Sequence, residues 1–404
     1  MTQATYLMAK KTSAAKDGSG GDRRNSMEYT AHSVRKACDI LKCFDSEHQV
    51  LRLDEITRRV GVPKPTVFRL IHTLADCDML ERRGKNLYCL HSLAKRKKIL
   101  RFGYAGESEE FSFARVVRES IHRSAYESGI DITMLDNRYS AAHAVRNAQK
   151  LVAEKVDLVI EFQAHHEAAA DVAAVFANAG IPLIALEIPH PGAYFYGANN
   201  YRAGWVGGHH LAQCCLNEWS GHCDELLLIG LPMAGEIPQT RMTGTLAGVR
   251  ELLPKLRDHQ VVSLNGSGRY EQSLDVVRRY LRRSRAKNVL IAGINDPSTL
   301  GALRAFQEAG QSHHSFAVGQ NATIEARREM RAPGSRLTGS VAYFPERYGE
   351  AVISFAFDIL GGKEVPPTLF VKHKLVTRGN VDVLYPNDAL VPLDAADSLL
   401  VSSR

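Results

Sequence analysis

The sequence lacks any run of about 18 apolar residues, the length that a membrane-spanning helix requires. It also lacks an apolar segment near its start, because residues 1–26 read MTQATYLMAKKTSAAKDGSGGDRRNS. A secretory signal needs such a segment. From these two absences we expect a protein that stays in the cytoplasm and has no membrane partner.

Paired cysteines are missing as well. The chain has seven cysteines, an odd number, and none belongs to a Cys-x-x-Cys pair. We therefore expect reduced, mostly buried thiols. One group of cysteines and histidines has no spacing typical of zinc, and most of it falls on a predicted helix, so we expect no metal site there. That group consists of His209, His210, Cys214, Cys215, His222 and Cys223.

The signatures of common α/β enzymes are also absent. The chain contains no Gly-x-Ser-x-Gly elbow, no Walker A sequence and no Gly-x-Gly-x-x-Gly between a strand and a helix. The Asn-Gly-Ser-Gly turn at residues 265–268 is too short a signal to change this. We predict no catalytic residue and no cofactor, with an α/β enzyme acting on a small polar metabolite as an alternative.

The positive charge is unevenly distributed along the chain. The formal net charge is +7, and it arises in the first quarter of the sequence, because the acidic and basic residues after residue 97 nearly balance. A local excess of lysine and arginine is typical of a module that binds nucleic-acid phosphates.

Residues 29–91 contain a recognisable order of elements. Helical apolar periodicity covers His32–Asp45 and Leu53–Val60, and a third helix begins near Lys64, after the breaker Gly61-Val62-Pro63. Residues 80–90 then read as two strands around a Gly-Lys-Asn turn. This order predicts a winged helix-turn-helix domain. The polar segment 1–28 before it is expected to be disordered, and residues 92–97 are expected to form a short basic linker.

The segment LDEITRRVGVPKPTVFRLIHTLADCDMLER resembles the IclR-type DNA-binding domain. The resemblance implies that the helix 64–76 enters the major groove of double-stranded DNA. The residues expected to contact DNA are Lys64, Thr66, Phe68 and Arg69 in the helix and Arg82, Arg83 and Lys85 in the wing. Arg69 suits guanine or phosphate. The alternatives are that the domain binds a protein and that Arg69 is only a solvated surface residue.

From residue 99 onward, short apolar runs alternate with longer amphipathic stretches. The runs are ILRFGYA, IDITMLD, DLVIEF, IPLIALEI, ELLLIG, VVSL, NVLIAGI and SFAVG. The alternation predicts an α/β fold of doubly wound, mainly parallel sheets. Residues 98–386 are long for one sheet, so we expect two lobes. The expected bounds are 98–198 with 344–372, and 199–343 with 373–386, followed by a loosely held tail at 387–404.

Several segments between Ile99 and Val383 resemble type I periplasmic sugar-binding proteins and the effector domains of lac-repressor-family regulators. They include IPLIALEI, GANNYRAG, QTRMTG, AGIND with LGALRAFQEAG, VGQNAT and KLVTRGNV. The resemblance implies a ligand-binding cleft between the lobes, dense in Asn, Asp, Glu and Arg. The residues it implies as ligand contacts are Phe111, Glu187, Asn199, Arg241, Asn295, Asp296, Asn321 and Tyr343.

The matched positions follow predicted strands, where open α/β sheets bind ligands. Amides, carboxylates and an arginine suit a sugar or polyol. Three departures from the family pattern (Ile188 for Arg, Asn321 for Asp, Tyr343 for Gln) widen the expected ligand to a small, polyhydroxylated or otherwise polar metabolite. Glu187 and Asn321 have a structural alternative as helix caps or turn formers. His165 and His166 are either solvated loop residues or additional ligand contacts.

Together these patterns predict a transcription regulator whose winged helix-turn-helix binds a DNA operator and whose two-lobed domain binds a small effector. The resemblance to lac-repressor-like regulators implies a homodimer that binds a palindromic site. A solute-binding protein for sugar uptake is the alternative from another class, and both the helix-turn-helix and the missing export signal argue against it.

Overall fold

A computed structural model describes residues 31–45, 49–91 and 99–390 of the 404-residue chain. The chain divides into two compact units, an N-terminal unit at residues 1–99 and a C-terminal unit at residues 100–404. The expected polar segment 1–28 and the expected linker 92–97 lie outside the described residues.

The N-terminal unit is a small helical domain with a three-stranded antiparallel sheet. Its elements are α1 (His32–Leu41), β1 (Leu51–Arg52), α2 (Leu53–Val60), α3 (Lys64–Asp76), β2 (Leu80–Gly84) and β3 (Leu87–Leu90), and the sheet order is β1-β3-β2. Gly61 ends α2 in the left-handed region at φ 66°, which glycine adopts without strain. The predicted winged helix-turn-helix fold is therefore confirmed, with β1 as an additional short strand.

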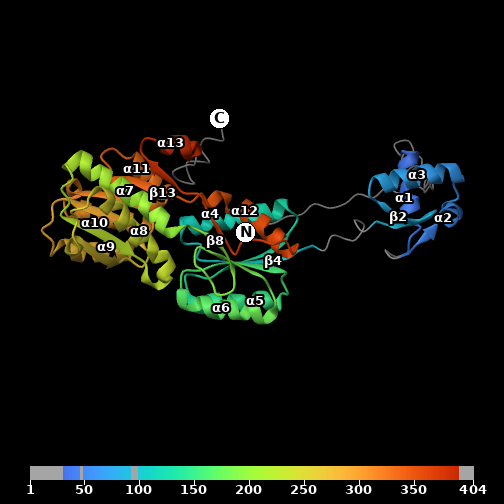
Figure 1. Ribbon diagram of the computed structural model, residues 1–404, viewed down its shortest axis with the longest axis horizontal. Helices are drawn as coiled ribbons and strands as arrows, with labels where there is room; N and C mark the ends of the chain where they lie inside the picture. The colour runs from blue at the N-terminus through green and yellow to red at the C-terminus, as the bar shows by residue number, and fades with distance from the viewer. Residues whose placement is uncertain (1–30, 46–48, 92–98, 391–404) are drawn as a thin grey trace, which may run out of the picture. The chain divides into compact units, whose positions relative to one another are not determined.

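Lobe 1 of the C-terminal unit is a six-stranded parallel sheet in the order β14-β8-β7-β6-β4-β5. The strands are β4 (Arg101–Gly106), β5 (Asp131–Asp136), β6 (Leu158–Phe162), β7 (Leu183–Leu186), β8 (Tyr194–Gly197) and β14 (Thr368–Phe370). Helices α4 (Ser112–Glu127) and α12 (Tyr348–Leu360) cover one face, and α5 (Ala141–Ala153) and α6 (His166–Ala179) cover the other (Figure 1). Both faces are covered, which explains why the central strands are almost wholly apolar.

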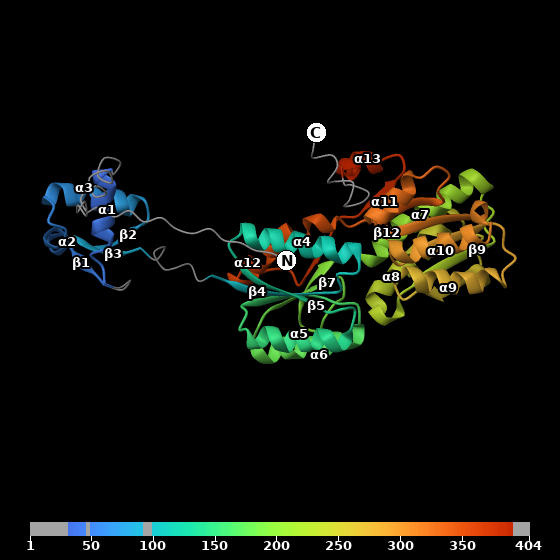
Figure 2. The same ribbon diagram turned by 180° about the vertical axis from the view of Figure 1, so that it is seen from behind.

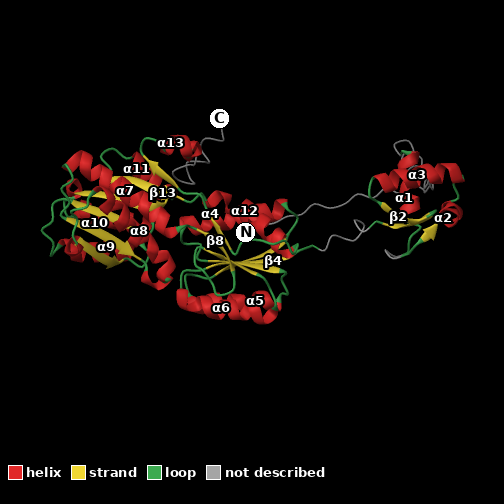
Figure 3. Cartoon of the chain, in the orientation of Figure 1, coloured by secondary structure: helices red, strands yellow, loops and turns green. Residues whose placement is uncertain are grey.

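Lobe 2 is a second six-stranded sheet in the order β10-β9-β11-β12-β13-β15, and only the β13–β15 pairing is antiparallel. The strands are β9 (Glu225–Gly230), β10 (Val261–Asn265), β11 (Val289–Gly293), β12 (Ser315–Asn321), β13 (Leu337–Ala342) and β15 (Lys374–Thr377). One face packs on α7 (Asn200–Trp219) and α8 (Glu236–Leu252). The other packs on α9 (Tyr270–Leu281), α10 (Asp296–Glu308) and α11 (Ile324–Arg331), as Figures 2 and 3 show from opposite sides. The predicted two-lobed α/β architecture is confirmed.

Short 3-10 turns complete the C-terminal unit. They are Pro232–Ala234, Asp258–Gln260, Ser312–His314, Pro345–Arg347 and Pro386–Leu390. The chain passes between the lobes three times: from β8 into α7, from β13 into α12, and from β14 into β15. Side chains connect these crossings, since the Asn199 backbone N–H donates to His373 Nε2 at 3.0 Å and the His373 ring lies 5.0 Å from that of Tyr343.

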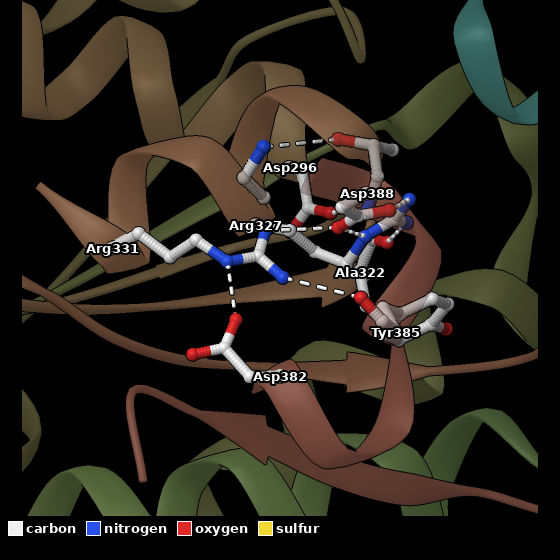
Figure 4. Close-up of polar contacts among 9 residues, drawn as sticks. Asp296, Ala322, Arg327, Arg331, Asp382, Tyr385 and Asp388 are labelled. Carbon is white, nitrogen blue, oxygen red and sulfur yellow. Dashed lines mark hydrogen bonds and ion pairs between the residues drawn. The ribbon is translucent and has the colours of Figure 1, made fainter. Parts of the chain in front are cut away.

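The end of the described chain is docked onto lobe 2, which corrects the expectation of a loose tail from residue 387. Helix α13 (Val381–Leu384) and the turn Pro386–Leu390 bring Asp388 against α11. There its carboxylate accepts from Arg327 at 2.7 Å and from Arg331 at 2.8 Å (Figure 4). The sequence pattern around Asp388 is too short to reveal a contact with arginines about 60 residues earlier. Residues 391–404 lie outside the described part of the chain.

Candidate ligand-binding cleft and DNA-binding helix

A partly open cavity lies between the two lobes. Lobe 1 contributes Glu107, Phe111, Ser112, Phe113, Tyr139, Phe162, Ala164, Glu187 and Ile188. Lobe 2 contributes Leu231, Ala234, Pro238, Arg241, Gly268, Ile294, Asn295, Pro297, Asn321 and Thr323. Most of these residues follow the carboxyl ends of parallel strands, where the doubly wound sheet leaves room for a ligand.

Five of the eight residues expected to bind the ligand line this cavity: Phe111, Glu187, Arg241, Asn295 and Asn321. Glu187 and Asn321 have positive φ angles of 61° and 96°. Strained backbone of this kind concentrates at functional sites, because surrounding structure must hold it. Asn295 also caps α10, since its side-chain oxygen accepts from the Ser298 N–H at 3.0 Å.

Glu187 and Arg241 face each other across the lobe boundary. Arg241 Nη2 lies 3.9 Å from Glu187 Oε2, and both side chains are about nine-tenths buried. Tyr348 donates its hydroxyl hydrogen to Glu187 Oε1 at 2.5 Å. Burial raises the pKa of Glu187, while the Arg241 charge and the Tyr348 hydrogen bond lower it. The pair thus joins a lobe 1 carboxylate to a lobe 2 guanidinium on the wall of the cavity.

Arg241 is held in place by its own hydrogen bonds. Its Nη1 donates to the Ile294 backbone oxygen at 2.5 Å, and its Nε and Nη2 donate to Asn200 Oδ1 at 3.1 and 2.6 Å. These bonds fix the planar guanidinium of Arg241 on two sides.

The backbone around Arg241 depends on close packing between α7 and α8. A Cβ atom on Gly204 would lie only 1.9 Å from the Arg241 backbone oxygen, and one on Gly208 only 2.1 Å from that of Thr245. Only glycine permits this approach. Gly204 and Gly208 therefore position the backbone of α8 around Arg241 as well as packing the two helices.

The structure does not bring the other three expected ligand residues to the cavity lining. Asn199 caps α7, because its side chain accepts from the Arg202 N–H at 3.0 Å. Asp296 is fully buried and accepts from the Ser340 hydroxyl and the Thr323 N–H, both at 2.6 Å. Tyr343 is buried beside a crossing between the lobes and donates to Gln320 Oε1 at 2.8 Å. All three lie next to the cleft, but in this structure their polar atoms are used by protein partners.

Among the lining residues that the sequence did not predict, Glu107 and Tyr139 have titratable side chains. Glu107 follows β4 in the loop that also contains Phe111. Tyr139 donates to the Ser267 backbone oxygen at 3.0 Å, which joins lobe 1 to lobe 2 at the cleft. Arg269 stacks on Tyr139, with its guanidinium carbon 4.5 Å from the ring centre. Selecting polar residues that directly follow a predicted strand would have included Glu107. Tyr139 lies in a loop with no distinctive sequence pattern.

The cavity is less polar than expected. Ten of its nineteen lining residues have apolar side chains, including Phe111, Phe113 and Phe162. The structure therefore corrects the expectation of a cleft dense in amides and carboxylates. His165 does not line the cavity, and its Nε2 lies 3.1 Å from the Tyr139 backbone oxygen. The neighbouring His166 lies against Gly235 of lobe 2 and does not line the cavity either.

In the N-terminal unit, α3 has one buried and one exposed face. Val67, Ile71 and Leu74 are buried against the core. On the other face Lys64, Phe68 and Arg69 are exposed and Thr66 is half-buried. The wing residues Arg82, Arg83 and Lys85 are also exposed. Lys64 forms a surface ion pair with Asp54 at 2.5 Å, and Arg83 forms one with Glu81 at 2.9 Å. Such exposed pairs are weak, so phosphate groups can replace these partners.

Among the described residues, no helix is both long and apolar enough to cross a membrane. The same part of the chain contains no group of three or more His, Cys, Asp or Glu side chains that could hold a metal ion.

Two sheets joined by three crossings, with a cavity between them, define a periplasmic-binding-protein-like fold, and this fold follows a helix-turn-helix unit. The family described as "Periplasmic binding protein domain" matches residues 102–364, more than half of the chain. The chain belongs to this family. The IclR helix-turn-helix domain matches residues 33–84, so the N-terminal unit carries that domain. Neither is an enzyme family. No curated protein is significantly similar to the chain in sequence.

Solved structures of solute-binding proteins share the fold of the C-terminal unit. One is an ABC transporter solute-binding protein from Bacillus halodurans with bound myo-inositol, at 17% identity and a TM-score of 0.62, covering 71% of this chain and 98% of that one. Another, from Actinobacillus succinogenes with bound D-allose, has 17% identity and a TM-score of 0.60, covering 70% and 99%. A third, from Mycobacterium smegmatis with bound glycerol, has 18% identity and a TM-score of 0.62, covering 70% and 96%.

Proposed function

We propose that this protein is a cytoplasmic, ligand-responsive transcription regulator. Its IclR helix-turn-helix binds an operator in double-stranded DNA, and its two-lobed unit binds a small sugar or polyol that changes operator affinity. The single observation that carries the proposal is the presence, in one chain, of a DNA-binding domain and a binding-protein fold with a cleft. A homodimer that presents two reading helices to a palindromic site is part of the proposal.

The solute-binding relatives support the ligand class, because their structures contain myo-inositol, D-allose and glycerol. In this chain Glu187, Arg241 and Asn321 supply acceptors and donors for hydroxyl groups, and Phe111 offers an aromatic face for a sugar ring. We propose that the cleft is supported by Asn199, Asp296 and Tyr343, whose polar atoms bind other parts of the protein and not the ligand. Closure of the two lobes on the ligand is the conformational change that alters DNA binding.

The test of sensing is a thermal-shift screen of the purified chain against sugars and polyols, beginning with myo-inositol, D-allose and glycerol. A ligand that binds only the folded state raises the melting temperature, and above its Kd the rise grows with the logarithm of the ligand concentration. No shift with any sugar or polyol contradicts the sensing half of the proposal.

The test of DNA recognition uses Arg69→Ala. Duplexes selected from a random library by the full chain provide the operator, and fluorescence anisotropy measures its affinity. Because a bidentate arginine–guanine contact contributes roughly 1–3 kcal/mol, we expect at least a tenfold loss of affinity with the ligand-induced thermal shift unchanged. Arg146→Ala, an arginine on α5 in the C-terminal unit, is the control and should bind DNA normally. Unchanged affinity in Arg69→Ala would remove this residue from the reading helix.

A further inference from the structure

The cavity contains more negative than positive charge. Its charged lining residues are Glu107, Glu187 and Arg241, which gives a formal sum of −1. Arg241 lies against Glu187 at 3.9 Å, so these two charges compensate each other. The remaining negative charge belongs to Glu107, which follows β4 in lobe 1.

The Glu107 carboxylate has no hydrogen-bond or ion-pair partner among the described residues. The nearest additional cation, Arg269, is not a lining residue. It is stacked on Phe111 and Tyr139 at 5.3 and 4.5 Å and pairs with the exposed carboxylate of Glu110 at 3.5 Å. Arg269 therefore attracts Glu107 only at longer range.

The surroundings of Glu107 disfavour its negative charge. Burial, and then the like charge of Glu187, raise the pKa of Glu107 to about 8, while Arg269 opposes the shift. The phenol of Tyr139 also faces this part of the cavity. It is neutral near pH 7, since burial and the Glu107 charge raise its pKa above its ordinary value. A half-buried carboxylate without a partner is unfavourable, and a cation supplied by the ligand removes that penalty.

The rest of the wall suits an organic cation rather than a metal ion. Phe111, Phe113, Tyr139 and Phe162 supply aromatic surface, and such rings attract ammonium groups. The described residues offer no cluster of three metal ligands at this place. Ile188 and Ile294 contribute only apolar contacts. The cavity combines a free anionic acceptor, an aromatic wall and a polar Glu187–Arg241 side.

We propose that the effector is an amino sugar or amino polyol whose protonated amine binds the Glu107 carboxylate while its hydroxyl groups bind on the Glu187–Arg241 side. This inference rests on the proposed sensing function and narrows its ligand class. The ammonium donates to Glu107, and the ion pair shifts the ionisation of that carboxyl group back toward the charged form. No covalent bond forms between the ligand and the protein.

The test is isothermal titration calorimetry of the full chain at pH 7.5 with matched ligands. Each series contains an amino compound, its hydroxyl counterpart and a neutral derivative: D-glucosamine, D-glucose and N-acetyl-D-glucosamine, then the galacto and manno equivalents. N-methyl-D-glucamine and D-sorbitol form an open-chain pair. We expect the amino member of at least one series to bind at least tenfold more tightly than its hydroxyl and acetylated partners.

Two variants test whether Glu107 causes the preference for the amino compound. Glu107→Gln keeps the size of the side chain and removes its charge, so the preference for the amino compound over its hydroxyl partner should fall by at least tenfold. Glu109→Gln is the matched control on the same loop, since Glu109 is exposed and does not line the cavity. It should retain the full preference.

The outcomes separate this inference from the proposed function. Tight binding of hydroxyl compounds without an amine preference overturns the inference and leaves sugar sensing intact. An amine preference that persists in Glu107→Gln also overturns it, because the charge that selects the ligand then lies elsewhere. If no compound of either class binds, both the inference and the sensing function fail.

Discussion

Glu161 is a fully buried carboxyl group that does not line the ligand cavity. It lies on β6, where its Oε1 accepts from Asn137 Nδ2 at 2.8 Å, while its Oε2 is buried without a hydrogen-bond partner in the described structure. Burial raises the pKa of Glu161 to about 8, and the Asn137 hydrogen bond only partly opposes this. Near neutral pH the folded protein therefore keeps this group protonated, whereas the unfolded chain releases the proton near pH 4.5.

This difference makes the C-terminal unit less stable as pH rises. The unfolded state loses its proton near pH 4.5 and the folded state only near pH 8, so the free energy of unfolding falls between these values. We expect Glu161→Gln to reduce this slope and to be more stable than the wild type at pH 8 by a few kcal/mol, because each unit of pKa difference corresponds to about 1.4 kcal/mol. Urea denaturation at several pH values measures both quantities. The exposed Glu109→Gln variant should behave like wild type, and an unchanged slope in Glu161→Gln would contradict the assignment.

At the residue scale, sequence position predicted which loops form the cleft but not which side chains enter it. Asn295 and Asp296 are adjacent in one matched segment, yet Asn295 lines the cavity and Asp296 is buried against Ser340. Tyr343 was expected to bind ligand in place of a glutamine, but its ring fills the space beside Phe113 and His373. The direction of a side chain after a strand depends on packing from distant segments, and a linear motif does not contain that information.

At the element scale, apolar runs and breakers predicted the long central elements well. The second helix of the N-terminal unit was predicted at Leu53–Val60 and observed there, and the eight apolar runs of the C-terminal unit all became strands. The strands β8, β13, β14 and β15 were not among the predicted runs. Strand β14 has three residues and pairs with β8, which lies about 170 residues earlier. Edge strands this short gain their stability from a distant partner, so their own sequence gives little signal.

The close contact between α7 and α8 predicts that Gly204→Ala destabilises the protein and weakens ligand binding. A Cβ at this position collides with the Arg241 backbone oxygen, so α8 must move and take the arginine with it. We expect a loss of about 2–4 kcal/mol in unfolding free energy and at least a tenfold weaker affinity for the ligand found in the screen. Gly207→Ala on the same helix is the control, because its nearest neighbour is the flexible end of Gln320 at 3.3 Å. Equal behaviour of the two variants would show that the close approach at Gly204 has no role in positioning Arg241.

The docked C-terminal segment makes a second prediction at this scale. The Asp388 side chain is 10% exposed and pairs with Arg327 and Arg331, whereas the Asp382 side chain is 80% exposed and pairs with Arg331 alone. Removing the buried anion leaves Arg327 without a carboxylate partner and Arg331 with only the exposed Asp382, so Asp388→Asn should lose about 2–3 kcal/mol of unfolding free energy. Asp382→Asn should lose less than about 1 kcal/mol.

Limited proteolysis measures the docking of this segment directly. In Asp388→Asn, trypsin should cleave after Arg378 faster than in wild type, because the segment that follows detaches from α11 more often. The Asp382→Asn variant should be cleaved at the wild-type rate. Equal cleavage of all three proteins would mean that Tyr385 and Val381 hold the segment without help from the ion pairs.

At the scale of the whole molecule, the chain consists of two units with separate cores. The N-terminal core is built around Ile40, Ile56 and Ile71, and the C-terminal unit has its own clusters in each lobe. Each unit therefore has the packing needed to fold cooperatively, and a domain of about 60 residues buries less of its surface than one of about 300, so its stability is lower. A ligand stabilises only the unit that binds it.

We therefore expect two transitions in differential scanning calorimetry of the full chain. The selected operator duplex should raise the melting temperature of the smaller transition, which belongs to the N-terminal unit. The ligand found in the screen should raise the melting temperature of the larger transition. Regulation requires in addition that the two ligands affect each other, and linkage then demands that operator changes effector affinity by the same factor as effector changes operator affinity. Titrating each in the presence and absence of the other measures both factors. A single transition raised by either ligand alone would mean that the units fold as one, and equal affinities in all four titrations would contradict the regulatory proposal while leaving both binding activities in place.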